Sequence, residues 1–320
     1  SVASLLVGKV ITNKLNPQVL PHLDVWNWEV PVYLFLGGLS AGLLVLASGL
    51  LLLQKGGVFS HTERGPFSYA VKAGSLLAPI LLGTGMFFLF LDLAYKVHVW
   101  RFYTAFVYTS PMSWGSWLLV LFFPLSVAQA LVVNREWFQK FTFLKPIINL
   151  TEKYLNLIAM TNVHLGAGVG VYTGILLSTF YARTLWSSAI LGFVFLLSGL
   201  SAAAALIMLL APENEKLMFS KIDMYLISLE GFATTLFIVG GITGSENVRE
   251  AMIYLISGNY APWFWVVFVF GGMILPLMLE TLESLKKVKF SPIVPILVLL
   301  GSITLRFVIV FAGQEFPTFA

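Results

Sequence analysis

The sequence predicts an all-α integral membrane protein with eight transmembrane helices. Three observations lead to this prediction. Apolar residues make up 58% of the 320 residues and charged residues only 11%, which leaves too little polar surface for a soluble globule. Uncharged stretches of roughly 20 residues, the length that crosses a bilayer, recur along the chain. The charged residues lie mostly in short connectors between these stretches, as the cost of moving charge into lipid requires.

The apolar stretches are too long and too rich in leucine for the strands of a membrane β-barrel, which have about 10 residues of alternating polarity. Residues 1–29 open with SVASLLVGKV, which lacks the basic start and the cleavage site of a signal peptide, so we expect them to be mature sequence at the outer face. The eight helices are expected over residues 30–53, 73–95, 114–133, 155–180, 186–210, 223–243, 262–283 and 292–312.

The basic residues indicate how these helices are oriented. The loops after the first, third, fifth and seventh helices carry 12 of the 19 Lys and Arg, whereas the N-terminal segment and the other loops carry 6. Because basic residues stay on the cytoplasmic side, both termini are expected outside. The pI of about 9.2 is then explained by basic loops that face anionic lipid, not by binding of nucleic acid.

The tryptophans are distributed even more unevenly than the basic residues. Eight of the nine fall at the outer ends of the expected helices, and only Trp137 falls at an inner end. Anchoring at the membrane interface explains part of this set, but a symmetric belt would occupy both ends. The excess indicates a binding site or a docking face at the outer surface. The outer residues are Trp26, Trp28, Trp100, Trp114, Trp117, Trp186, Trp263 and Trp265.

A weak internal repeat divides the chain into two parts. LGGLSAGLLVL in the first helix and LSGLSAAAALI in the fifth share a face of small residues, and both helices run from outside to inside. This pattern fits a duplication of two four-helix bundles. Small residues also occur wherever membrane helices pack closely, so both interpretations remain open.

Ionisable residues at membrane depth are costly, and each suggests a function. A proton path through them is one interpretation; pairing of Arg306 with a carboxylate or with carbonyl groups is the other. Glu29, Asp223 and Glu280 are expected at helix ends, where their side chains can reach the membrane surface. The residues expected at depth are Asp92, His164, Glu230 and Arg306.

The sequence lacks the ligands of the usual redox metal centres. It has no cysteine, which excludes an iron–sulfur cluster, a disulfide and thiol chemistry of its own. A transmembrane b-type haem needs two facing histidines, but of His22, His61, His98 and His164 only the last lies deep in an expected helix. We therefore expect no haem, no metal site and no electron transfer across the membrane through this chain.

Five segments occur in order between Trp26 and Gln314: WNWEVPVYLFLGGLSAG, SPMSWGSW, YTGILLS followed by RTLWSS, FLLSGLSAAAAL and LRFVIVFAGQ. Each is weak alone, but the ordered set resembles the polysulfide reductase membrane subunit and the wider NrfD-like family. Members of this family are quinone-interacting anchors of respiratory complexes in the prokaryotic cytoplasmic membrane, folded as two four-helix bundles. The resemblance implies a first bundle with the quinone site over residues 30–180 and a second over residues 181–320.

The resemblance also implies cofactors and partners. Quinone, either menaquinone or ubiquinone, is the only expected cofactor. A ferredoxin-like iron–sulfur subunit would dock on the outer face and connect to a molybdopterin, hydrogenase or multihaem cytochrome subunit. The protein would then carry the quinone half-reaction of an oxidoreductase without catalytic residues of its own. A secondary transporter is the alternative, although a transporter should have polar residues and broken helices near the midplane.

With both termini outside, the starts of the first and third helices meet the ends of the second and fourth at one depth. Tyr33, Asp92, Trp114 and Tyr172 are therefore expected around one outer cavity, where Trp114 forms a flat wall and Gly115 permits close approach.

By resemblance, Tyr33 takes the place of a family quinone ligand, and Tyr172 matches a tyrosine that hydrogen-bonds a quinone oxygen. The compared member has His at the position of Tyr33 and Asn at that of Val30, which is a departure in this sequence. Trp28 and Glu29 complete the expected quinone-binding set. Quinone reduction consumes protons, which come either from outside or from inside along the path of Asp92, His164, Glu230 and Arg306. The first route is electroneutral and the second translocates charge, and the sequence leaves both open.

Overall fold

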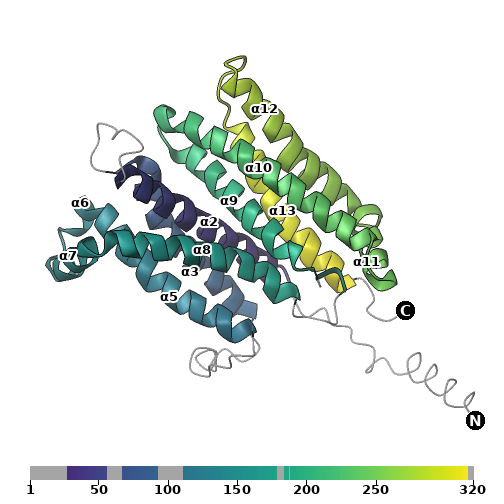
Figure 1. Cartoon of the computed structure of the whole chain (residues 1–320), viewed down its shortest axis with the longest axis horizontal. Helices are drawn as coiled ribbons and strands as arrows, with labels where there is room; N and C mark the ends of the chain where they lie inside the picture. The colour runs from purple at the N-terminus through teal and green to yellow at the C-terminus, as the bar shows by residue number, and fades with distance from the viewer. Residues whose placement is uncertain (1–26, 56–66, 93–110, 179–183, 187, 316–320) are drawn as a thin grey trace, which may run out of the picture.

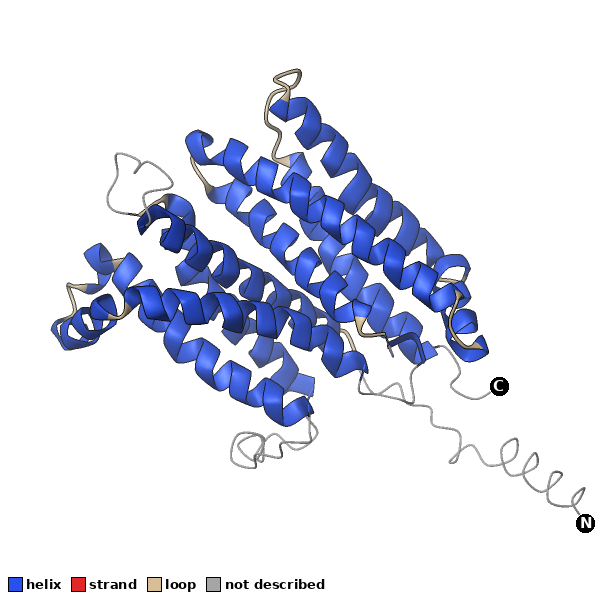
Figure 2. Cartoon of the chain, viewed as in Figure 1, coloured by secondary structure: helices blue, strands red, loops and turns tan. Residues whose placement is uncertain are grey.

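The computed structural model describes residues 27–55, 67–92, 111–178, 184–186 and 188–315 (Figure 1). These residues form helices and connecting turns, without a strand (Figure 2). The predictions for Trp26, Trp100, His22, His61 and His98 lie outside the described residues.

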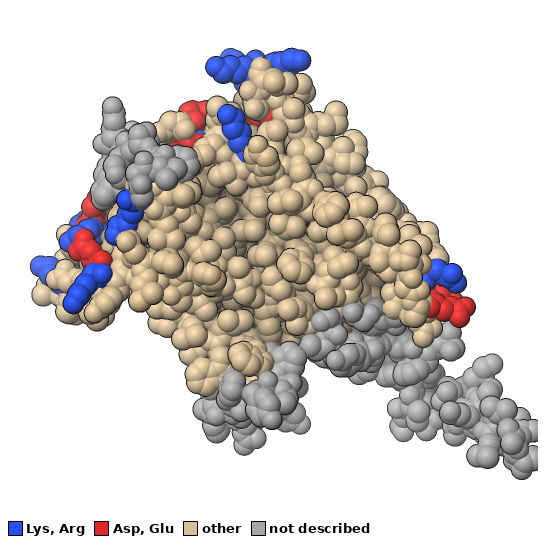
Figure 3. Space-filling view, viewed as in Figure 1, with Lys and Arg blue, Asp and Glu red and all other residues tan. Residues whose placement is uncertain are grey.

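Seven described helices are long and apolar enough to cross a membrane. Together they make this an all-helical, multi-pass membrane protein. On the face shown in Figure 3, charged side chains lie at the two ends of the molecule and an uncharged belt separates them, as a bilayer requires. The helices are α2 (Glu29–Lys55), α3 (Tyr69–Asp92), α5 (Pro111–Val133), α9 (Ile190–Leu210), α10 (Glu213–Ile242), the π-helical η4 (Trp263–Ile274) continued by α12 (Leu275–Ser284), and α13 (Ile293–Glu315).

The eighth expected span corresponds to α8 (Leu155–Ser178), which has 24 residues like α3. It is not among the seven because Asn156, Asn162 and His164 lower its mean hydropathy. Shorter helices connect the long ones: α6 (Arg135–Phe138), η2 (Thr142–Leu144) and α7 (Lys145–Lys153) before α8, then η3 (Thr184–Trp186) and α11 (Glu246–Ser257).

The start of α10 differs from the prediction, and this difference changes the position of Asp223 in the helix. α10 begins at Glu213, ten residues before the expected start at residue 223. The charged residues of this turn suggested a loop, but Glu213 and Glu215 lie in the first helical turn, where the helix dipole favours negative charge. Asp223 therefore lies within the helix and not at its end.

The long helices pack in two groups. In the first group α2 contacts α3 and α8, and α5 contacts the same two helices; in the second group α9 contacts α10 and α13, and η4 contacts α13. α2 and α9 lie side by side between the groups (Figure 1). The start of α2 and the end of α13 lie at one end of the molecule, here named the terminal end; the other is the opposite end.

The two segments that suggested a repeat pack against each other where α2 meets α9. A Cβ atom on Gly199 would lie 2.5 Å from the carbonyl oxygen of Gly38, and one on Gly42 would collide with the carbonyl group of Gly199. The small residues are therefore explained by close packing of the two helices.

The interior of the first group holds an uncharged hydrogen-bond network. The Gln129 amide donates to Ser75 at 2.9 Å, and its oxygen accepts from Ser48 at 3.0 Å and from Asn162 at 2.8 Å. These four residues come from α5, α3, α2 and α8, so one buried amide connects all four helices.

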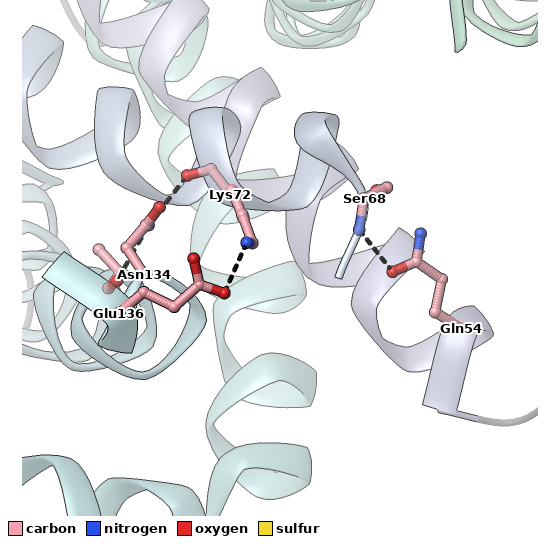
Figure 4. Close-up of polar contacts among 6 residues, drawn as sticks. Gln54, Ser68, Lys72, Asn134 and Glu136 are labelled. Atoms are coloured by element: carbon pink, nitrogen blue, oxygen red, sulfur yellow. Dashed lines mark hydrogen bonds and ion pairs between the residues drawn. The ribbon is translucent and has the colours of Figure 1, made fainter. Parts of the chain in front are cut away.

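Further contacts join the helices of the first group at the opposite end (Figure 4). Gln54 at the end of α2 accepts from the Ser68 amide at 3.3 Å. Asn134 donates to the Lys72 carbonyl at 3.1 Å, and the Lys72 ammonium lies 3.3 Å from Glu136.

Candidate functional site

Two predicted quinone ligands lie on facing helices at the terminal end of the first group. Tyr33 is in the second turn of α2 and is 5% exposed, with its ring near Gly85 of α3. Tyr172 of α8 contacts Gly115 of α5, because a Cβ atom on that glycine would overlap the tyrosine ring and hydroxyl. The SPMSWGSW segment thus accommodates the ring of Tyr172 through its single glycine.

The start of α2 contributes two more predicted residues. Trp28 is 49% exposed, and its ring lies edge-on to Phe88 with the centroids 5.7 Å apart. Glu29 is the first residue of α2, and its Oε2 atom is buried without a hydrogen-bond partner among the described residues. A buried acceptor without a donor is costly, so this carboxylate is suited to a ligand that brings a hydroxyl group.

The remaining predicted residues of this site differ in exposure. Trp114 is 53% exposed at the start of α5. Asp92 is the last residue of α3, and its side chain lies outside the described part. Trp186, also expected at the outer face, is buried and donates its Nε1 hydrogen to the Ile309 carbonyl at 2.8 Å.

Arg306 is fully buried in α13 at the junction of the two groups. Its Nη1 donates to the hydroxyl groups of Ser198 at 2.6 Å and Ser302 at 2.7 Å, and its Nη2 donates to the Phe195 carbonyl at 2.9 Å. A Cβ atom on Gly38 of α2 would lie 2.8 Å from Nη2. The guanidinium is therefore solvated by hydroxyl and carbonyl groups.

Glu230 is the acidic residue whose charge acts on this guanidinium. It is buried in α10. His164, in contrast, is exposed on α8, and its Nδ1 lies 2.8 Å from the Met160 carbonyl of its own helix. The structure therefore brings Glu230 and Arg306 together but does not bring His164 to them.

The expectation that Asp223 and Glu280 reach the membrane surface is wrong. Both side chains are 0% exposed, and Ser201 of α9 donates to Asp223 Oδ1 at 2.5 Å. The sequence analysis missed Asp223 because the start of α10 was placed too late. Glu280 does lie near the end of α12, but packing against other helices buries its side chain. A usable signal was the seven-residue spacing of Asp223 and Glu230, which puts both on one helix face.

Comparisons with known proteins give the family. A family model described as "Polysulphide reductase, NrfD" matches residues 15–318. The sequence is 33% identical over 307 residues to one chain of the polysulfide reductase of Wolinella succinogenes, a match that covers 91% of this protein and 95% of that one. It is 24% identical to a subunit of the selenate reductase of Mesobacillus selenatarsenatis (97% of this protein, 78% of that one) and 24% identical to a subunit of the tetrathionate reductase of Salmonella typhimurium (82% and 70%). These matches confirm the resemblance of the five ordered segments: the protein belongs to the NrfD family of polysulfide reductase membrane subunits.

Proposed function

We propose that this protein is the quinone-interacting membrane anchor of a respiratory oxidoreductase complex in a prokaryotic cytoplasmic membrane, with both termini outside and α8 as its eighth span. The observation that carries the proposal is the contact of Tyr172 with Gly115, which holds a phenol hydroxyl at the terminal end of the first group. Tyr33 lies at the same end, where α2 begins, with the Glu29 oxygen that has no hydrogen-bond partner in the described part of the protein.

These residues suit a quinone headgroup. Phenol hydroxyls donate hydrogen bonds to carbonyl oxygens, a carboxylate accepts from hydroxyl groups, and an exposed indole offers a flat face beside a ring. Tyr33 and Tyr172 would orient the headgroup, Glu29 would hold a proton, and Trp114 and Trp28 would line the entrance, with Asp92 at the end of α3 nearby. A bound quinone supplies the acceptor for two electrons and two protons.

The electrons require a partner, because this sequence has no cysteine for an iron–sulfur cluster. The relatives are each named as one component of a polysulfide, selenate or tetrathionate reductase, and such names imply other subunits. We propose an iron–sulfur subunit docked at the terminal end, where Trp28, Trp114 and Trp263 are exposed. Family membership favours this function over a secondary transporter.

The hydroxyl of Tyr172 provides the direct test. Tyr172→Phe keeps the ring against Gly115 but removes the donor, so quinone turnover by the purified complex should fall about tenfold or more, the value of a buried hydrogen bond. Thermal stability and partner binding should not change. The matched control is Tyr154→Phe, an exposed tyrosine between α7 and α8. Unchanged quinone kinetics in Tyr172→Phe would reject this residue as a ligand.

A further inference from the structure

The segment that joins α5 to α8, residues 135–154, is here named the α5–α8 connector. It contains α6, η2 and α7 and lies at the opposite end of the molecule (Figure 1). Six of its large apolar or aromatic side chains have exposed fractions between 46% and 74%: Trp137, Phe141, Phe143, Ile147, Leu150 and Tyr154. Exposed apolar side chains gathered in one short segment indicate an interaction surface.

α7 separates its buried residues from its exposed apolar residues. The helix packs against α5, and its buried residues are Ile148 and Thr151. Exposed apolar residues recur at spacings of four, three and four along α7 and the turns beside it, which places them on one side. They are Phe143, Ile147, Leu150 and Tyr154. This side, here named the apolar side of α7, is therefore presented to the surroundings of the molecule.

The connector also carries an excess of positive charge. Its two carboxylates are already paired with cations, in the ion pairs Glu136–Lys72 and Glu152–Arg135. Its three lysines have no carboxylate within ion-pairing distance in the described part of the chain: Lys140, Lys145 and Lys153. These ammonium groups are available to an anionic ligand.

Two of the three lysines lie beside exposed aromatic rings. The Nζ atom of Lys140 is 5.4 Å from the ring centroid of Trp137, and that of Lys153 is 5.4 Å from the ring centroid of Tyr154. Tryptophan, tyrosine and the stems of lysine are the side chains that bridge hydrocarbon and headgroups at a membrane surface. In this position the rings remain in the apolar region while the ammonium groups reach the phosphates.

The position of the connector fits this boundary. Charged side chains gather at the left of Figure 3, where α6 and α7 lie in the same view, and the uncharged belt begins beside them. A helix with one apolar side and with lysines on its polar side lies in the plane of the membrane interface. A bilayer supplies acyl chains for the apolar side and phosphates for the lysines at one depth.

We propose that the α5–α8 connector is a binding site for anionic phospholipid at the membrane surface. The apolar side of α7 lies among the acyl chains, and Lys140, Lys145 and Lys153 bind the headgroup phosphates. Anionic lipid attracts basic residues near the surface of a membrane, so the site selects a lipid such as phosphatidylglycerol over the zwitterionic phosphatidylcholine. The site does not depend on the proposed quinone function.

Spin labels on the reconstituted protein test whether the apolar side of α7 lies in the bilayer. The sequence has no cysteine, so one added cysteine carries the only label. In vesicles of phosphatidylglycerol and phosphatidylcholine, a label on Leu150→Cys should collide more with oxygen, which dissolves in lipid, than with a water-soluble nickel chelate. Asn149→Cys, an exposed neighbour outside the apolar side, is the matched control and should show the reverse order.

Two results of this measurement would overturn the proposal. Preferential collision of the Leu150→Cys label with the nickel chelate would place the apolar side of α7 in water. Shielding of this label from both reagents would show that protein, either a second copy or a partner subunit, covers the apolar side in place of lipid.

A fluorophore on Leu150→Cys then tests the preference for anionic lipid. Phosphatidylglycerol and phosphatidylcholine, each carrying a nitroxide quencher, are compared in otherwise identical vesicles. Phosphatidylglycerol should quench more strongly at low salt, and high salt should weaken this preference because it screens the lysines. The triple variant Lys140→Gln/Lys145→Gln/Lys153→Gln should lose about fivefold in preference for each lysine removed. Equal quenching by the two lipids with all three lysines present would overturn the proposal.

The matched control removes the same charge from another loop at the same end. Three exposed lysines lie between α12 and α13, and the variant Lys286→Gln/Lys287→Gln/Lys289→Gln should keep the preference for phosphatidylglycerol. Quenching by phosphatidylcholine should not change in either triple variant, because the apolar side of α7 stays intact. An equal loss of preference in the two triple variants would assign it to net charge alone and overturn the site.

Discussion

The interiors of the two helix groups use different chemistry for their polar contacts. In the first group, Gln129 connects Ser48, Ser75 and Asn162 through neutral hydrogen bonds. In the second group, the buried polar residues include the ionisable side chains Asp223, Glu230, Glu280 and Arg306. A neutral network holds helices in fixed positions, whereas ionisable groups can gain and lose protons. The comparison indicates a neutral hydrogen-bonded interior in the first group and an interior that holds ionisable groups in the second.

Loss of the buried guanidinium should have the largest effect on the second group. Arg306→Met removes donors to Ser198, Ser302 and Phe195 and leaves Glu230 uncompensated, so we expect a loss of about 3–5 kcal/mol or failure to fold. Thermal unfolding of the detergent-solubilised protein measures this loss. Arg249→Met on α11 is the exposed control and should unfold as the wild type does. A stable Arg306→Met variant would show that the second group does not depend on its charge.

Close packing in the first group is tested at Gly115. Gly115→Ala forces the ring of Tyr172 away from α5, which should lower stability by about 1–3 kcal/mol and reduce quinone turnover as strongly as Tyr172→Phe. Gly231→Ala in α10 is a matched control, because no atom lies within 4 Å of the added methyl group. Normal turnover in Gly115→Ala would mean that the position of Tyr172 is not critical.

Loss of a neutral hydrogen bond in the second group should lower stability less than loss of its charged groups. Trp186→Phe removes the hydrogen bond to the Ile309 carbonyl, with an expected loss of about 1 kcal/mol and no change in quinone turnover. Unfolding and steady-state assays on one preparation measure both quantities. A loss of quinone turnover at unchanged stability would instead assign Trp186 a role in function.

The smallest expected effect is a change in how stability depends on pH, and it concerns a tyrosine at the terminal end. Tyr254 of α11 donates to Glu315 at 3.0 Å, and partial burial together with this carboxylate raises the pKa of its hydroxyl above the ordinary 10.0. The contact therefore contributes stability below about pH 10 that is lost as the pH rises through the raised pKa. Tyr254→Phe should flatten this alkaline decline in melting temperature slightly. If the alkaline decline in melting temperature is equally steep in the variant, other titrating groups cause it.

The sequence predicted the existence of the helices well, because hydropathy over roughly 20 residues is a strong signal. It also predicted the family from five ordered segments. It did not predict α11 or the early start of α10, because charged turns resemble loops. Nor did it reveal that Ser198 and Ser302 surround Arg306, since serines in an apolar helix look like ordinary small residues. The exposure of His164 depends on the rotation of α8, which tertiary packing sets.

The junction of α2 and α9 limits how the molecule can move. Transporters that rock one helix bundle against another need an interface that slides. Here Gly42 and Gly199 lie against the facing backbone, and Arg306 lies against Gly38. If α2 and α9 slid past each other by one residue, carbonyl groups of one helix would collide with Cα atoms of the other. The guanidinium of Arg306 would also lose its hydrogen-bond partners. Spin labels on α5 and α12 should therefore keep a constant separation during quinone turnover.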